Sequence, residues 1–78
     1  MTKKIKLYST PSCIYCHMAK QFFEENNINF EYIDVSANQE AAKEMVQKSG
    51  QMGVPVIEIN GEIVIGFDEP KIQSLIKN

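Results

Sequence analysis

Two kinds of hydrophobic pattern alternate along this chain, and their order limits the folds available to it. Short β-rich runs predict strands at residues 3–9, 29–35, 54–59 and 62–65. Apolar residues at helical spacing predict a helix over 14–27, a second that begins at Ser36 and ends near Gly50, and a last one opened by Asp68-Glu69-Pro70. The predicted order is therefore β-α-β-α-β-β-α, which is typical of an α/β protein.

The connections between these segments predict a mixed sheet. A strand–helix–strand unit makes a parallel pair, whereas Asn60-Gly61 between two β-rich runs is typical of a type I′ hairpin and makes an antiparallel pair. A four-stranded mixed sheet of this kind needs helices on both faces. We expect N-caps at Ser12 for the first helix and at Ser36 for the second, where Gln39 would complete a capping box.

Length and composition limit the functions open to the chain. Its 78 residues suffice for one domain, expected to span residues 1–78, with a small core and no deep cofactor cavity. It contains no arginine and has a net charge of −2, which argues against nucleic-acid binding. No stretch is apolar enough to span a bilayer and no signal peptide is recognisable. We therefore expect a cytoplasmic protein without membrane partners, and we expect a monomer.

Cys13 and Cys16 form a Cys-X-X-Cys motif where the first predicted strand turns into the first predicted helix. In a helix these positions share one face, with Cα atoms about 5–6 Å apart, which suits a reversible disulfide. The first helical turn carries unpaired N–H groups and partial positive charge, which favour a thiolate. Cys13, the outer residue, is the expected nucleophile, and Cys16 would then attack the mixed disulfide at Cys13 and release the reduced substrate.

Two plainer interpretations of the motif stay open. The cysteines could be an inert intracellular pair packed at a helix start. They could also bind a metal, but zinc prefers four ligands, and the local supply is Cys13, Cys16 and His17. Because His17 follows Cys16 directly, it points to a different helix face. We therefore predict no metal site and no tightly bound cofactor, and we place His17 at the surface.

The motif and three further segments together resemble the glutaredoxin family, which has the thioredoxin-like fold. The segments are Ile5-Lys6-Leu7-Tyr8-Ser9, Cys13-Ile14-Tyr15-Cys16, Gly53-Val54-Pro55-Val56 and Gly66-Phe67-Asp68. Their order and spacing carry the resemblance, which covers nearly the whole chain, whereas the Cys-X-X-Cys motif alone is only moderately specific. The resemblance implies a thiol–disulfide oxidoreductase that reduces protein disulfides or glutathione mixed disulfides, with glutathione as a co-substrate.

The resemblance also implies which loop faces the reactive thiol. It implies a cis peptide bond between Val54 and Pro55, in a loop that pairs with the substrate backbone like a short extra strand. On the residues alone, Pro55 could instead begin an edge strand with a trans bond. Tyr15 corresponds to the motif tyrosine that lines the substrate groove in the family.

A second substrate wall is implied at Gly66-Phe67-Asp68. Gly66 would allow close approach of backbone to substrate. Asp68 begins the last predicted helix, where free N–H groups can hold an anion such as the γ-glutamyl carboxylate of glutathione. Asp68 could equally serve only as an N-cap, and the two roles are compatible.

Four positions depart from the pattern of many glutaredoxins. Thr10 stands where many have a lysine, Met52-Gly53 where many have a basic residue and threonine, and Ile14 where many have proline. The first two changes remove contacts for the glycine carboxylate of glutathione. The chain is therefore also similar to glutaredoxin-like redoxins that are reduced by thioredoxin reductase, so its electron source stays open between that enzyme and glutathione.

Two hypotheses come from other functional classes. Two chains could share an iron–sulfur cluster through Cys13 thiolates, with glutathione as a further ligand. The absence of proline at Ile14 permits such a cluster, whereas a free Cys16 thiol opposes it by forming a disulfide with Cys13. A purely structural adaptor would instead have no reactive thiol at Cys13.

Overall fold

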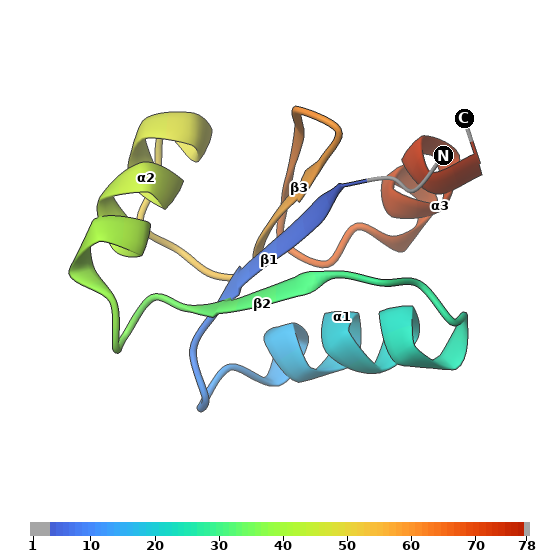
Figure 1. Ribbon diagram of the computed structural model, residues 1–78, viewed down its shortest axis with the longest axis horizontal. Helices are drawn as coiled ribbons and strands as arrows, with labels where there is room; N and C mark the ends of the chain where they lie inside the picture. Colours follow the sequence, from blue (N-terminus) through green and yellow to red (C-terminus); the bar gives the residue numbers. More distant parts are fainter. Residues whose placement is uncertain (1–3, 78) are drawn as a thin grey trace.

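The computed structural model describes residues 4–77. Within them, one sheet has the order β2-β1-β3-β4, built from β1 (Ile5–Ser9), β2 (Glu31–Asp34), β3 (Val56–Ile59) and β4 (Glu62–Ile65). The helices are α1 (Ile14–Glu25), α2 (Gln39–Ser49) and α3 (Glu69–Lys77) (Figure 1). β1 pairs parallel with β2 and antiparallel with β3, and β3 pairs antiparallel with β4. The predicted element order and mixed sheet are thus confirmed.

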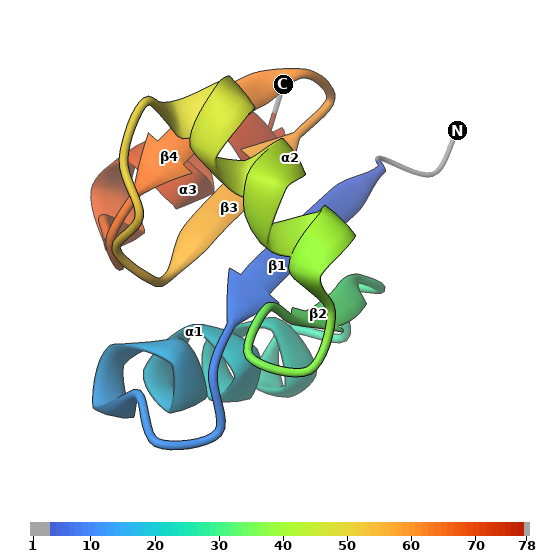
Figure 2. The ribbon, with the colours of Figure 1, turned by 90° about the vertical axis from the view of Figure 1, so that its left-hand side faces the viewer.

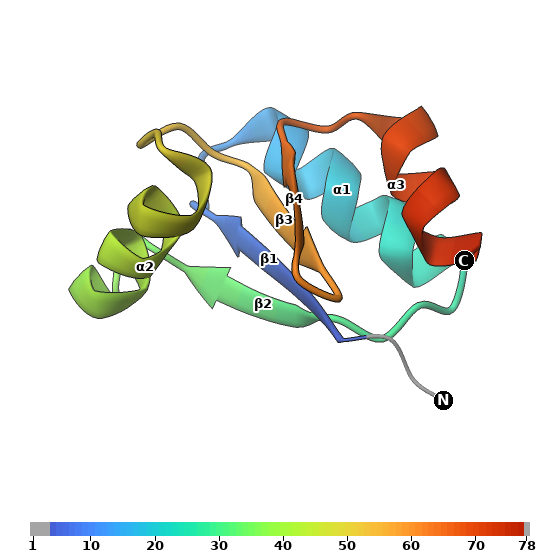
Figure 3. The same cartoon turned by 90° about the horizontal axis from the view of Figure 1, so that it is seen from above.

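Helices cover both faces of the sheet, as predicted. α1 and α3 lie on one side of the strands and α2 on the other (Figures 2 and 3). Alternating strand residues belong to two hydrophobic clusters, one on each face of the sheet. Leu7 and Ile57 pack with Phe23 of α1 and Ile72 of α3, and the opposite face of the same strands packs with α2. No helix among residues 4–77 is long and apolar enough to cross a membrane.

The N-caps of α1 and α2 differ from the prediction. α1 is capped by Cys13 and not by Ser12, because the turn keeps Cys13 extended, at φ −86° and ψ 116°. α2 begins at Gln39 and is capped by Asn38, whose side-chain oxygen accepts from the Ala41 amide at 3.1 Å. The predicted capping box at Ser36 is wrong because residue 36 lies in the preceding turn.

The turn glycines behave as the sequence predicts. Gly50 ends α2 in the left-handed conformation, with φ 77°. Asn60 and Gly61 have φ values of 50° and 89°, as a type I′ hairpin requires of its two central residues. The hairpin is tied to the start of β1, since the Asn60 amide donates to the Lys4 carbonyl at 3.0 Å and the Lys4 amide donates to the Asn60 side chain at 3.0 Å.

Candidate active site

Cys13 holds its sulfur at the N-terminus of α1. The Cys16 amide donates to the Cys13 sulfur at 3.1 Å, so Cys13 is both the N-cap of the helix and a candidate reacting group. This position combines a direct N–H donor with the positive end of the helix dipole, and both stabilise negative charge on sulfur. Cys13 is only half-buried, so a substrate sulfur can reach it.

Cys16 occupies a different environment from Cys13. This residue is 1% exposed and lies in the first turn of α1. Burial raises the pKa of the Cys16 thiol to about 12, and the hydrogen bond with Cys13 acts in the same direction, against an opposing contribution from the Thr10 backbone. The two thiols therefore have distinct properties: one is accessible and held by an N–H group, and the other is covered and protonated.

The loop before β3 lies directly against the Cys13 thiol. The Val54–Pro55 peptide bond is cis, which confirms the expectation and excludes a strand that begins at Pro55 in the trans form. The Cys13 sulfur lies 3.8 Å from the Val54 carbonyl oxygen, to which its S–H donates. Because of this loop, β3 begins at Val56, two residues later than the pattern predicted.

The loop after β4 is joined to the cis-proline loop. The Gly66 amide donates to the Pro55 carbonyl oxygen at 2.9 Å. Gly66 has a φ of 78°, and a Cβ placed there would meet no atom within 4 Å. No neighbouring protein atom therefore requires glycine at this position, and the close approach of a substrate to the Gly66 backbone stays a prediction. The left-handed backbone conformation is the physical requirement at this position.

Phe67 and Asp68 continue this wall into α3. The Asp68 side chain accepts from the Lys71 amide at 3.4 Å, and its carbonyl accepts from the Ile72 amide at 2.9 Å, so the N-cap prediction is confirmed. Phe67 is half-buried and meets the ring of Phe22 edge-on, with ring centroids 6.0 Å apart. The wall thus has an apolar part that faces α1 and an exposed carboxylate at a helix start.

Thr10 and Tyr15 lie on either side of the Cys13 turn. The Thr10 carbonyl accepts from the Cys13 amide at 3.3 Å, which closes the turn. Tyr15 is 62% exposed on the first turn of α1, so its ring is available to a bound partner. The structure therefore brings Cys13 and Val54 into one site, and Gly66 joins this site through its bond to Pro55. The Thr10 carbonyl closes the turn that holds Cys13, and the Tyr15 ring is exposed two residues after Cys13.

The sequence pattern did not predict the exposure of two apolar side chains. Ile14 is 74% exposed and Met52 is 82% exposed, although both residues are apolar. Hydrophobic periodicity could not predict this exposure, because Ile14 is the first residue of α1 and Met52 lies in the loop before β3. His17 lies at the surface as expected, and its ring Nε2 is 2.7 Å from the Pro11 carbonyl oxygen, which holds the turn before Cys13.

The comparisons with known proteins agree with this geometry. The glutaredoxin family model matches residues 5–64. A glutaredoxin-like 8.6 kDa protein from the rubredoxin operon of Clostridium pasteurianum is 41% identical over 94% of this chain and 97% of its own length.

Solved structures give the same result. The thioredoxin-like protein BC3987 superposes with a TM-score of 0.85, at 32% identity over 91% of this chain and 97% of that one. The glutaredoxin-like NrdH-redoxin of Escherichia coli, described as having a thioredoxin-like activity profile, superposes with a TM-score of 0.82, at 29% identity over 92% of this chain and 93% of that one.

Proposed function

Because this chain belongs to the glutaredoxin family, we propose that it is a dithiol oxidoreductase in which Cys13 attacks a disulfide and Cys16 resolves the intermediate. The observation that supports this proposal most is the 3.1 Å hydrogen bond from the Cys16 amide to the Cys13 sulfur. It holds the accessible sulfur at a helix N-terminus and places the second cysteine one turn behind it.

In the first step the Cys13 thiolate attacks one sulfur of a substrate disulfide. The substrate S–S bond breaks, a mixed disulfide forms at Cys13, and the departing thiolate takes up a proton. The cis-proline loop would bind the substrate backbone beside the attacked sulfur, since its Val54 carbonyl already lies 3.8 Å from the Cys13 sulfur.

In the second step Cys16 attacks the Cys13 sulfur of the mixed disulfide. The Cys16 thiol loses its proton, the bond between Cys13 and the substrate breaks, and the departing substrate thiolate takes up a proton. The chain keeps a Cys13–Cys16 disulfide, and the substrate has gained two electrons. The high pKa of buried Cys16 keeps it protonated until this step. The cycle needs no resident cofactor, because an external thiol or reductase restores the dithiol.

Two sources of electrons fit the site, and each has an observation in its favour. Glutathione would use the wall at Gly66 and Asp68, where an exposed helix start can hold a carboxylate. Reduction by thioredoxin reductase is favoured by Thr10, Met52 and Gly53, which supply no cation for a second carboxylate. The similarity to a glutaredoxin-like protein with a thioredoxin-like activity profile also supports the second source.

Two coupled assays test the proposal and separate these sources. NADPH consumption with a small disulfide substrate is followed with glutathione plus glutathione reductase, and separately with thioredoxin reductase alone. Turnover in either assay that is lost in Cys13→Ser supports the oxidoreductase. Turnover in the first assay assigns glutathione, and turnover only in the second assigns thioredoxin reductase. The proposal would be overturned if neither assay showed turnover.

A further inference from the structure

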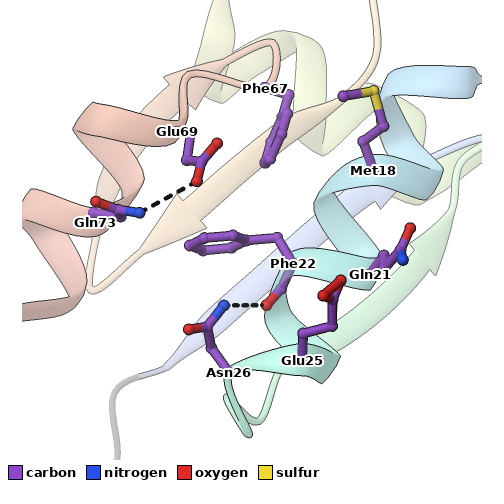
Figure 4. Close-up of a pocket in the computed structure, with 8 residues that line it drawn as sticks. All are labelled: Met18, Gln21, Phe22, Glu25, Asn26, Phe67, Glu69 and Gln73. Carbon is purple, nitrogen blue, oxygen red and sulfur yellow. Dashed lines mark hydrogen bonds between the residues drawn. The ribbon is translucent and has the colours of Figure 1, made fainter.

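A groove with a volume of about 430 Å³ runs between α1 and α3. Figure 4 shows side chains from both helices that project toward it, together with Phe67 from the loop before α3. The residues that line it are Met18, Gln21, Phe22, Glu25, Asn26, Phe67, Glu69 and Gln73. We call it the α1/α3 groove. Neither cysteine lines it, so it is separate from the reacting centre.

The apolar part of the groove is formed by Met18, Phe22 and Phe67. The two phenylalanine rings meet edge-on, with centroids 6.0 Å apart, and Met18 lies beside Phe67 at one end of the groove (Figure 4). Met18 is 43% exposed although it continues the apolar stripe of α1. A partner side chain that covered these groups would remove apolar surface from water, which favours binding.

The rim of the groove is acidic. Glu25 comes from the last turn of α1 and Glu69 from the first turn of α3, and both are exposed. The Gln73 amide donates to Glu69 at 3.2 Å, which orients that carboxylate. Among residues 4–76, no basic side chain lines the groove, and neither glutamate takes part in an ion pair. The groove therefore offers two carboxylates to a positively charged partner group.

The groove starts close to the reacting thiol and leads away from it. Phe67 directly follows Gly66, whose amide is bonded to the cis-proline loop. Along α1, a rise of 1.5 Å per residue places Met18 about 8 Å and Glu25 about 18 Å beyond Cys13. An extended peptide advances about 3.3 Å per residue, so about five to six residues from a target cysteine would reach Glu25.

We propose that the α1/α3 groove binds a segment of a protein substrate that flanks the target cysteine. An apolar side chain of the segment covers Phe22 and Phe67, and a lysine or arginine side chain lies between Glu25 and Glu69. This inference rests on the proposed function and adds its substrate class: a protein disulfide in a basic segment. Glutathione carries two carboxylates, which the acidic rim repels, so it is a poor occupant of this groove.

The test uses short synthetic peptides whose single cysteine is a mixed disulfide with thionitrobenzoate, a chromophore released on reduction. After each turnover the Cys13–Cys16 disulfide is reduced again by NADPH through whichever of the two reducing systems above supports turnover. One peptide carries an apolar residue and lysines about four to six residues from the cysteine on both sides. A second has glutamines in place of the lysines, and a third has glutamates. The enzymes are the wild-type chain, Glu25→Gln/Glu69→Gln, and the control Glu24→Gln/Glu62→Gln, which removes two exposed carboxylates outside the groove.

We expect the wild-type KM to rise from the lysine to the glutamine to the glutamate peptide, by about threefold to tenfold between the first two, with kcat little changed. The groove variant should lose this preference and the control should keep it. The preference should also shrink as salt is added, because exposed ion pairs are screened. The double replacement Glu25→Lys/Glu69→Lys should reverse the order and favour the glutamate peptide.

Two results would overturn the groove proposal: equal KM values for the three peptides, or a preference that survives in Glu25→Gln/Glu69→Gln. Reduction of a neutral small disulfide, measured with the same enzymes, distinguishes failure of the groove proposal from failure of the proposed function. If the wild-type chain reduces the small disulfide but shows no peptide preference, only the groove proposal fails. If it reduces neither substrate, the oxidoreductase assignment fails as well. Urea unfolding of each variant checks that a loss of preference does not come from a loss of fold.

Discussion

The backbone amide of Gly66 donates a 2.9 Å hydrogen bond to the carbonyl oxygen of Pro55, and this bond joins the two loops beside the Cys13 thiol. One loop precedes β3 and the other follows β4, so the β3–β4 hairpin positions both. Pro55 is buried, and the neighbouring Val54 carbonyl lies 3.8 Å from the Cys13 sulfur. The backbone conformation of Gly66 therefore bears directly on the geometry of the site.

Replacement of Gly66 by alanine should cost both stability and activity. Its φ of 78° is one that side-chain-bearing residues rarely adopt, and we expect a loss of about 1–2 kcal/mol in the free energy of unfolding. Gly50→Ala is a matched control, because Gly50 has a φ of 77° and equally open surroundings, but it ends α2. Urea unfolding should show similar losses for both variants, whereas kcat/KM should fall only in Gly66→Ala. Unchanged activity in Gly66→Ala would contradict a role for this loop.

The two cysteines should react very differently with an alkylating agent. The pKa of Cys16 is raised to about 12, chiefly by burial, so Cys16 stays a protonated thiol at neutral and mildly alkaline pH. Iodoacetamide at about pH 7–8, below the ordinary thiol pKa, should label Cys13 in the folded, reduced chain and leave Cys16 unlabelled until urea is added. Peptide mapping by mass spectrometry measures this directly. Equal labelling of both thiols in the folded chain would contradict the burial argument.

The same pKa shift predicts a loss of stability at alkaline pH. A raised folded-state pKa gives a contribution that is full below the unfolded value of about 8.5 and is lost as pH rises toward the folded value. The free energy of unfolding of the reduced chain should therefore fall from about pH 9 upward. Cys16→Ala should show a shallower fall, measured by urea unfolding between about pH 7 and 10.5 with a reductant present. Parallel curves would show that Cys16 does not supply this dependence.

Glu44 should supply part of the loss of stability in acid. The hydroxyl of buried Tyr8 donates to the Glu44 carboxylate, and this bond, followed by the one from Lys48, lowers the Glu44 pKa. A lowered folded-state pKa gives stability that is present above the unfolded value of about 4.3 and is lost as pH falls. Glu44→Gln should therefore be less stable than wild type at neutral pH and lose less on acidification. Glu24→Gln, on the exposed side of α1, should follow the wild-type curve in urea unfolding from about pH 7 to 3.

Replacement of Ser9 by alanine should leave stability unchanged or raise it by about 1 kcal/mol. The Ser9 hydroxyl is fully buried and has no hydrogen-bond partner among the described residues, so its burial is uncompensated. Ser49→Ala provides the contrast, since the Ser49 hydroxyl donates to the Met45 carbonyl at 2.7 Å and accepts from the Gln51 amide at 3.3 Å. That variant should lose about 1 kcal/mol in the free energy of unfolding. A large loss in Ser9→Ala would mean that its hydroxyl does have a partner.

The sequence pattern predicted the order of elements and the mixed sheet because each element carries its own period and its own turn residues. Asn60-Gly61 is a clear example, since both residues adopt the positive φ that the dipeptide predicts. The helix starts were less accurate. Cys13 caps α1 in place of Ser12, and Asn38 caps α2 in place of Ser36, because several residues near each start could serve and only the path of the turn selects one.

The chemistry proposed for the Cys-X-X-Cys motif comes from the spacing of its cysteines, but that spacing could not predict the surroundings of Cys13. The contact between the Cys13 sulfur and the Val54 carbonyl joins residues 41 positions apart, and only the fold brings them together. The cis bond at Pro55 was expected from family resemblance and not from composition. Likewise, no sequence pattern distinguishes Glu25 and Glu69 from the other glutamates of the chain. The packing of α3 beside α1 is what places them on one groove.

The most direct test of the central claim is to trap the intermediate. Cys16→Ser, mixed with a disulfide-bonded peptide, should accumulate a mixed disulfide, and mass spectrometry should map the bond to Cys13. Cys13→Ser should form no such adduct at a comparable rate, and the wild-type chain should form the Cys13–Cys16 disulfide and release reduced peptide. An adduct at Cys16 in place of Cys13, or full multiple-turnover reduction by Cys13→Ser, would contradict the account.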